Sequence, residues 1–421
     1  MTVWRQLFTR RMLICVFTGF ASGLPLYLLL SLVPAWLRTE HVDLRVIGLL
    51  TLIQFPYNWK FLWAPLVDRY ALPVLGRRRG WMLLTQVGLL VTIATLGGLS
   101  PQTELRAIVL VATLLAFLSA TQDIALDAYR RELLADNELG LGTAVHINAY
   151  RIAGLVPASL SLVLADILPW SVVFAVTALF MVPGMVMTLL VREPHRAAPP
   201  RTLREAVVEP FHEFINRKGW SNALLILTFL LFYKLGDSMC TALATPFYLD
   251  MGFSKTQIGL VAKNAGLWPS VVGGLLGGLW MVKIGVNKAL WLFGFVQVFS
   301  IFGFAWLAAA GHHTEITSVD LTRLAIVIGL EALGVGLGAA ASGAFIARAT
   351  HPGYTATQYA LFTSLAVVPR TFANAATGWL VDTLGWMGFF FLCAALAVPG
   401  MLLLFKVAPW KGDQSSGHLV I

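Results

Sequence analysis

The chain has 421 residues, of which 58% are hydrophobic and only 12% are charged. A soluble core does not need so large an apolar fraction, so the composition excludes an ordinary soluble domain and favours a protein that lies in a bilayer. The net charge of +9 resides in short segments between apolar runs rather than on one basic face, which argues against nucleic acid as a partner.

Apolar runs of about 18 residues or more recur along the chain, and each is long enough to cross the roughly 30 Å of a bilayer core. The first run follows Arg5, Arg10 and Arg11 and has no small-residue cleavage site, so we interpret it as a span rather than a signal peptide. The second run is the least regular, because Pro56, Asn58 and Lys60 interrupt it. The pattern predicts an all-α membrane protein with twelve transmembrane helices in two six-helix halves, at approximately residues 12–34, 46–67, 81–99, 106–129, 141–165, 170–191, 221–249, 256–282, 289–310, 321–348, 357–381 and 386–406.

Most of the 30 Lys and Arg residues fall in segments that share one side of the membrane under this map. The positive-inside rule then predicts that both termini are cytoplasmic. The longest hydrophilic connection divides the chain into an N-terminal half, 1–192, a cytoplasmic linker, 193–220, and a C-terminal half, 221–421. Within the linker, apolar and charged residues alternate from Leu203 to Phe214, which suits either a helix on the inner membrane surface or a solvated loop.

Glycines four residues apart recur inside the predicted spans. They include Gly19 with Gly23, Gly334 with Gly338, and a cluster in the eighth span at 273–278. Small residues at this spacing let helix backbones approach closely, so we expect them to serve helix packing, and sliding helices would need the same surface.

Motifs for soluble chemistry are missing from the sequence. It has no phosphate-binding Gly-x-x-x-x-Gly-Lys-[Ser/Thr], no His-Glu-x-x-His, and no arrangement that suggests a nucleophile. The three cysteines, Cys15, Cys240 and Cys393, are far apart and lie in apolar runs. We therefore expect neither an enzyme nor a resident metal or cofactor.

The segment after the second span contains Asp68-Arg69-Tyr70 and then Gly76-Arg-Arg-Arg-Gly80. This resembles the Asp-Arg…Gly-Arg-Arg loop of the major facilitator superfamily, although Ala64 stands where that signature has glycine. An acid at a helix end that faces arginines can hold one conformation and release it in another. We predict a conformational latch formed by Asp68, Arg69, Arg77 and Arg78; the alternative is a simple positive-inside cluster with an exposed ion pair.

The fourth span contains Gln122 and two acids, Asp123 and Asp127, which share one helix face because they are four residues apart. A carboxylate within the hydrocarbon zone is costly, and protonation is the usual escape. Asp127 has Arg130 and Arg131 one turn away, so a structural ion pair is its alternative role. Asp123 has no cation near it in sequence, and we predict that it carries the proton, with Asp127 as a possible sharer; substrate hydrogen bonding or an interhelix bridge are the alternatives for Asp123.

Other ionisable residues also fall within spans, where such groups normally face the bundle interior or a wet cavity. Counted together with Asp123 and Asp127, the spans hold five cations and four acids, and this small positive excess would suit a substrate with carboxylates. Lys60 is instead expected to extend towards the inner interface. Lys234 and Asp237, three residues apart, are placed to neutralise each other. The predicted substrate-binding residues are Gln122, Tyr150, Arg151, Lys234, Asp237, Lys263, Glu331 and Arg370. Deeper aromatic residues such as Tyr27 and Trp268 are further candidates for a pocket wall.

Several longer segments resemble the AmpG-type muropeptide permeases of Gram-negative inner membranes. The segments are Phe20-Ala-Ser-Gly-Leu-Pro25, Lys60-Phe-Leu-Trp-Ala-Pro-Leu-Val-Asp68-Arg69-Tyr70, Gly76-Arg-Arg-Arg-Gly-Trp81, Ser119-Ala-Thr-Gln-Asp-Ile124, Tyr233-Lys-Leu-Gly-Asp-Ser238 and Thr357-Gln-Tyr-Ala-Leu361. The resemblance covers nearly all twelve predicted spans, and some family members have extra C-terminal spans that this chain lacks.

The resemblance implies a multi-pass protein of the bacterial inner membrane. It would import anhydromuropeptides, which are N-acetylglucosaminyl-anhydro-N-acetylmuramyl peptides, from periplasm to cytoplasm, driven by protons. In such a family the imported fragments feed peptidoglycan recycling and signal induction of β-lactamase, hence antibiotic resistance. We expect a monomer with the small-molecule substrate, protons and the lipid bilayer as its partners. The buried charges and glycine-rich spans also permit a passive channel or a ligand sensor on a transporter fold. A carrier of another small organic anion, such as an acyl-coenzyme A, resembles distant relatives of the same family and is the third alternative.

Overall fold

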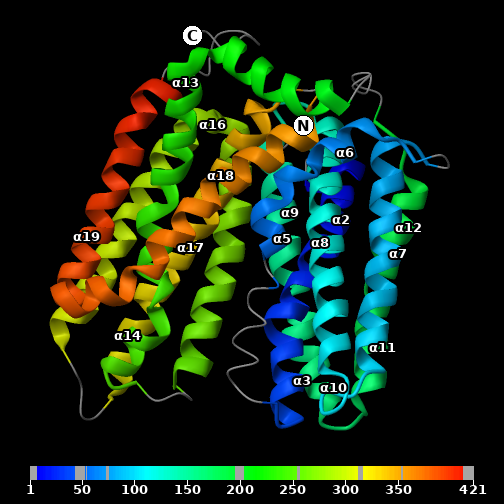
Figure 1. Ribbon diagram of the computed structural model, residues 1–421. Coiled ribbons are helices and arrows are strands. Elements are labelled where there is room, and N and C mark those ends of the chain that lie inside the picture. The colour runs from blue at the N-terminus through cyan, green and yellow to red at the C-terminus, as the bar shows by residue number, and fades with distance from the viewer. Residues whose placement is uncertain are drawn as a thin grey trace. The chain divides into compact units, whose positions relative to one another are not determined.

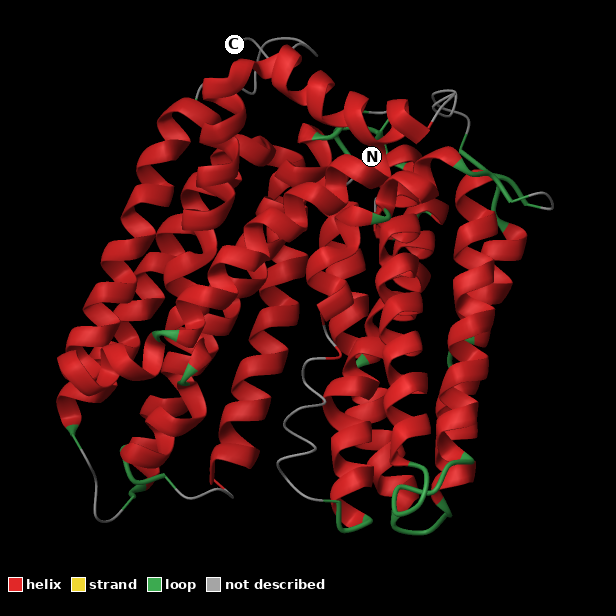
Figure 2. Ribbon diagram, viewed as in Figure 1, coloured by secondary structure: helices red, strands yellow, loops and turns green. Residues whose placement is uncertain are grey.

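The computed structural model describes residues 7–42, 53, 55–72, 75–194, 203–253, 257–311, 316–351 and 354–410. Helices joined by loops account for these residues, and no strand occurs in these ranges (Figure 2). Nine of the described helices are long and apolar enough to cross a membrane. One of them, Asn264–Ala310, has 47 residues and contains two of the predicted spans in succession. The predicted all-α membrane fold is confirmed.

The chain forms two compact units. The first unit contains residues 1–136, 145–213 and 350–364, and the second contains 137–144, 214–349 and 365–421. Residues 350–364 come from the second half of the sequence, yet they belong to the first unit. The expected division at 1–192 and 221–421 remains a prediction.

The helices of the first unit follow the first six predicted spans (Figure 1). The second predicted span lies partly outside the described residues, and the rest of it is broken into α5, a short 3-10 turn and α6. The elements are α2 (Arg10–Tyr27), η1 (Leu28–Leu32), α3 (Val33–Thr39), α5 (Phe55–Trp59), η3 (Lys60–Leu62), α6 (Ala64–Arg69), α7 (Arg77–Gly97), α8 (Leu105–Leu133), α9 (Leu139–Ala153), η4 (Val156–Leu160), α10 (Ser161–Ala165), α11 (Trp170–Leu179) and α12 (Val182–Leu190).

The second unit is built on longer helices, several of which contain a break. Gly219, Gly285 and Gly385 have φ angles of 75°, 78° and 68°, which end one helical run and start the next. The elements are α13 (Leu203–Ala242), α14 (Ala244–Asp250), η5 (Ile258–Ala262), α16 (Lys263–Ala310), α17 (Ser318–Ala349), α18 (Thr355–Ala375) and α19 (Thr377–Val407). Helices α9, α13 and α18 each contribute residues to both units.

Prolines and π-helical turns shape the first unit near its polar residues. Pro25 lies inside α2, three residues before the π-helical turn η1, and Pro157 lies within the π-helical turn η4. Proline removes a backbone donor, and a π turn absorbs the resulting distortion. The turns η1 and η4 pack against each other. The distortion at the end of α2 therefore lies beside the distortion that follows α9.

Glycines on α2 allow it to approach α9 closely. A Cβ atom at Gly19 would overlap the backbone carbonyl of His146, and one at Gly23 would overlap that of Tyr150. A Cβ atom at Gly273 of α16 would likewise overlap the backbone of Leu333 in α17. The packing role predicted for these glycines is confirmed, and on α9 the contact sets the position of polar residues that face α2.

The linker is helical from Leu203 onwards. Helix α13 starts at Leu203 and remains helical up to Gly219, so the helix alternative is confirmed over the loop alternative. Residues 195–202 lie outside the described part of the chain. Two hydrogen bonds attach the helix to α18, because the Gln358 amide donates to Pro210 O at 2.9 Å and to Glu213 Oε2 at 2.7 Å. Contact of this helix with a membrane surface remains a prediction.

Replacing Gly23 by alanine should destabilise the protein. The added methyl group would meet the backbone of Tyr150, which cannot move without shifting α9, and overpacking of this kind costs about 1–3 kcal/mol. We expect a lower unfolding temperature of the detergent-solubilised protein. Gly266→Ala is the matched control, since its Cβ would meet only Ile328 at 3.9 Å. Equal unfolding temperatures for the two variants would contradict close helix approach at Gly23.

Candidate functional site

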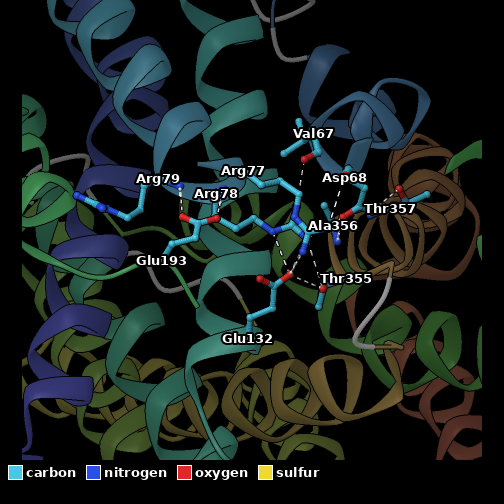
Figure 3. Close-up of polar contacts among 10 residues, drawn as sticks. All are labelled: Val67, Asp68, Arg77, Arg78, Arg79, Glu132, Glu193, Thr355, Ala356 and Thr357. Carbon is cyan, nitrogen blue, oxygen red and sulfur yellow. Dashed lines mark hydrogen bonds and ion pairs between the residues drawn. The ribbon is translucent and has the colours of Figure 1, made fainter. Parts of the chain in front are cut away.

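The first polar site is a buried ion-pair network at the end of α6. Asp68 and Arg78 are each fully buried, and Arg78 Nη2 donates to Asp68 Oδ1 at 2.7 Å. Arg78 also donates to Glu132 Oε1 of α8, from Nη2 at 2.6 Å and from Nε at 3.0 Å (Figure 3). A guanidinium group has donors in a planar fork, which allows one arginine to join two carboxylates.

The Asp68 carboxylate also binds the start of α18. It accepts hydrogen bonds from Ala356 N at 3.3 Å, from Thr357 N at 2.8 Å and from Thr357 Oγ1 at 2.7 Å (Figure 3). The first backbone N–H groups of a helix have no partner within the helix, and its dipole favours an anion there. Asp68 therefore caps a helix that begins almost three hundred residues later.

Neighbouring residues hold the arginine run in place. Gly76 has φ of 89° and precedes α7, so the chain can turn sharply before the three arginines. Glu193 accepts from the backbone N–H groups of Arg78 and Arg79, at 2.6 and 3.0 Å. It thus caps the first turn of α7 as Asp68 caps α18.

The predicted latch residues divide into two groups. Asp68 and Arg78 form the centre of the network, and Arg77 joins it through Glu132 at 3.6 Å and Asp68 O at 3.4 Å. Arg69 is different, since its guanidinium lies over the Tyr70 ring at 5.3 Å. The alternative of an exposed ion pair is wrong, because the central pair is fully buried.

The second polar site is a cavity of about 310 Å³ in the first unit. Charged and aromatic side chains line it from helices α2, α8, α9 and α18. The lining residues are Ser22, Tyr27, Asp123, Asp127, Arg130, His146, Ile147, Tyr150, Arg151 and Tyr359. Four of the predicted site residues, Asp123, Asp127, Tyr150 and Arg151, thus come together here.

Asp123 has two partners from other helices. Ser22 Oγ donates to Asp123 Oδ1 at 2.5 Å, and Lys60 Nζ lies 4.0 Å from Asp123 Oδ2. Lys60 also lies 3.9 Å from Asp127 Oδ2, and only 8% of its surface is exposed. The expectation that Lys60 extends to the interface is therefore wrong. Lys60 starts the turn η3, and its buried side chain lies beside two acids of α8, which balance its charge.

Asp127 forms the local ion pair that the sequence suggested. Arg130 Nη2 donates to Asp127 Oδ1 at 2.9 Å and to the Tyr359 hydroxyl at 2.8 Å. Arg131 instead pairs with Asp136 at 3.1 Å. Asp127 is thus held by two cations, Lys60 and Arg130. Among the ion pairs of the described residues, Asp123 has one, with Lys60 at 4.0 Å.

Gln122 differs from its neighbours on α8. It is fully buried, and its amide makes no hydrogen bond within the described ranges. It is not among the residues that line the cavity. The structure does not bring it together with Asp123, because adjacent residues on a helix point about 100° apart.

The remaining predicted binding residues belong to the second unit. Lys234 Nζ donates to Gln297 Oε1 at 2.7 Å and lies 3.5 Å from Asp237 Oδ2. Arg370 Nε donates to Ala366 O at 2.6 Å within its own helix and lies within electrostatic range of Asp237. Glu331 is buried on α17. The side chain of Lys263 lies outside the described part of the chain.

Sequence reasoning missed several residues that complete these sites. Glu132 follows the Arg130-Arg131 pair at the end of α8, and an acid at that position was the only signal for it. Thr357 and Tyr359 belong to a segment that resembles the AmpG-type permeases, but the resemblance assigned no role to either residue. Ser22 also stands in a segment that resembles the family, but the resemblance assigned it no role. His146 and Gln297 gave no signal, since a single polar residue in an apolar helix does not reveal its partner.

These features define a class of protein. Solute carriers are all-helical membrane proteins with ionisable side chains around a cavity, and the described part of the chain has these features.

Comparison with known proteins then identifies the family. The family model for the Major Facilitator Superfamily matches residues 15–319. A Haemophilus influenzae protein of unassigned function is 52% identical over 97% of both chains, and the anhydromuropeptide permease of Escherichia coli K12 is 40% identical over 94% of this chain and 79% of its own. A solved structure of the human organic anion transporter MFSD10 is similar with a TM-score of 0.68 at 18% identity, covering 94% of this chain and 99% of its own. The chain belongs to the major facilitator superfamily and, within it, to the AmpG-type permeases, as its sequence motifs predicted.

Replacing Arg78 by glutamine should strongly destabilise the first unit. Asp68 and Glu132 would remain buried without their shared cation, and breaking a buried pair in this way costs about 3–5 kcal/mol. Thermal unfolding in detergent should show a large loss. Arg69→Gln removes the same charge from the same loop, at a guanidinium that lies over the Tyr70 ring, and is the control. Similar losses for both variants would count against a special role for Arg78.

Replacing Lys60 by methionine should destabilise the protein in a way that Asp123→Asn partly reverses. Without Lys60, two acids face the same cavity without their common cation. Removing one negative charge relieves this, so the double variant should be more stable than additivity predicts, by about 0.5–3 kcal/mol. Unfolding measurements on the two single variants and the double variant give this coupling directly. Strict additivity would show that the 4.0 Å contact has no energetic effect.

Proposed function

We propose that the protein imports anhydromuropeptides from the periplasm into the cytoplasm, coupled to protons, by alternating access. It would act as a monomer in the inner membrane with both termini in the cytoplasm, and supply peptidoglycan recycling. The observation that carries this proposal is the cavity in which Asp123, Asp127, Arg130 and Arg151 meet on membrane-spanning helices. The name of the Escherichia coli relative supports the choice of substrate.

The side chains around the cavity fit the chemistry of such a substrate. Arginines bind carboxylates through paired donors, and a muropeptide has carboxylates on its peptide stem. The rings of Tyr27 and Tyr150, whose centroids are 5.6 Å apart, offer an aromatic wall to a sugar. Small-molecule pockets usually have volumes of about 300–1,000 Å³, so 310 Å³ suits one part of the substrate rather than its whole.

Proton coupling follows from the charges in the cavity. While Asp123 is ionised, it repels a substrate carboxylate and balances the nearby cations. Once it is protonated, the cavity is more positive by one charge and binds an anion more strongly. Linkage then requires the converse, that a bound anion favours the protonated state of Asp123. Asp127 is held more tightly by Arg130 at 2.9 Å, which supports Asp123 as the primary proton carrier and Asp127 as its modulator.

Lys234 and Arg370 of the second unit supply a further positive group. Together with Asp237 they have a net charge of +1, which supports contact with another carboxylate of the substrate. Glu331 and Lys263, the other predicted binding residues of this half, are kept as substrate-binding residues in the proposal.

The network at Asp68 supplies the conformational latch in this proposal. Its bonds to Thr357 can exist only while the start of α18 remains beside α6. Transport requires these bonds to break and form again in each cycle, because alternating access moves one part of the chain against another.

Replacing Asp123 by asparagine should abolish uphill uptake and preserve exchange. Asparagine retains an oxygen for the Ser22 hydroxyl but cannot take up the proton. Purified protein in proteoliposomes should no longer concentrate a labelled anhydromuropeptide when a pH gradient is imposed, yet it should still exchange internal for external substrate. Asp136→Asn is the control, since that side chain is 73% exposed and lies outside the cavity.

The same assay separates the competing functions. A passive channel would equilibrate the solute with or without a gradient, and a sensor would move none. Wild-type accumulation by Asp123→Asn would rule out the assigned proton carrier. Competition by other organic anions against the anhydromuropeptide identifies the preferred substrate.

Replacing Arg151 by glutamine should weaken substrate binding more than it lowers expression. A hydrogen bond to a charged group contributes about 1.5–3 kcal/mol, so affinity should fall by about ten- to a hundredfold. Arg106→Gln, an exposed arginine at the start of α8, is the control. Titration of the purified protein with the anhydromuropeptide measures the change, and an unchanged dissociation constant would remove Arg151 from the site.

A further inference from the structure

The surroundings of Lys234 include a neutral partner that is closer than its acid. Lys234 Nζ lies 2.7 Å from Gln297 Oε1 and 3.5 Å from Asp237 Oδ2. A lysine ammonium sits on a flexible four-carbon stem, so it needs a partner to hold it at one place. A neutral amide can do this without cancelling the positive charge.

Gln297 is itself held in one orientation. It lies on α16, only 3% of it is exposed, and its Nε2 is 3.4 Å from Phe293 O one turn earlier in the same helix. With its amide nitrogen directed at the backbone, its oxygen is available to Lys234.

Two glycines of α17 face Gln297, and they differ in what they accommodate. A Cβ atom at Gly338 would overlap the side-chain amide of Gln297, whereas one at Gly334 would come no closer than 3.4 Å to its backbone. Glycine is a poor helix former, and Gly338 lies inside a regular helix without a positive φ. The missing side chain at 338 therefore provides the space in which the Gln297 amide lies.

We propose that Gln297 is a positioning residue for Lys234, and that Gly338 makes this position possible. Gln297 fixes the ammonium in one place, so that it meets a substrate carboxylate without first having to be ordered. The inference rests on the proposed role of Lys234 in substrate binding.

The test compares alanine at the two glycines. In Gly338→Ala the methyl group displaces the end of a flexible side chain, so the fold should survive while Lys234 loses its contact with Gln297. The affinity of the purified protein for an anhydromuropeptide should fall about tenfold, and Gly334→Ala should match the wild type. In a Gln297→Ala background, Gly338→Ala should have no additional effect, because no amide remains to be displaced.

A second measurement works without substrate. Reductive methylation followed by mass spectrometry gives the rate at which Lys234 reacts, and this rate should rise in Gly338→Ala and Gln297→Ala but not in Gly334→Ala. An unchanged rate in Gln297→Ala would overturn the positioning role, even if Gly338→Ala failed to fold. If the rates rise as expected while Lys234→Met binds substrate like the wild type, positioning holds and the proposed binding role of Lys234 is wrong.

Discussion

The structure depends on the cost of holding charge away from water. Each acid that the first unit buries has a cation beside it, but the pairs differ in closeness. Asp68 and Arg78 are fully buried and 2.7 Å apart, whereas Asp123 is 4.0 Å from Lys60 and its side chain is 14% exposed. A tight, dry pair is costly to separate, and a loose, partly wet one can lose or gain a proton. The same constraint thus produces a tight, buried pair in one place and a looser, partly exposed pair in the other.

Asp68 shows how one carboxylate can serve two kinds of partner. It meets a full positive charge on Arg78 and the partial positive charge at the start of α18. Neither partner alone explains why this carboxylate can be fully buried. Because the α18 segment comes from the second half of the sequence, the charge balance of the first unit is complete only when residues from both halves of the sequence contribute.

Much of the fold and part of the two polar sites could be predicted from the sequence. The remaining contacts could not be predicted, for a physical reason. Spans, glycine packing and the Asp68–Arg78 pair follow from hydrophobic length and local spacing, which a single sequence contains. The Lys60 contact with Asp123 depends on how the broken second span turns beside α8, and no periodicity describes a broken helix. Gln297 lies far along the chain from Lys234, so its role became visible only once α13 and α16 were placed together. Gln122 does not line the cavity that contains Asp123. The two residues are adjacent in sequence, but they point to different faces of the helix.

Small residues in such a protein do more than allow helices to pack closely. Lipid is as apolar as the helices, so helices gain little from the hydrophobic effect when they associate, and backbone contact must supply the difference. Gly19 and Gly23 bring α2 against the carbonyls of α9, and that contact places Tyr150 and Arg151 beside Ser22 and Asp123. The glycines therefore decide where polar side chains can meet, even though they make no polar contact through a side chain. A residue with no side chain can in this way set the geometry of a charged site, provided that the helix facing it contributes the polar groups.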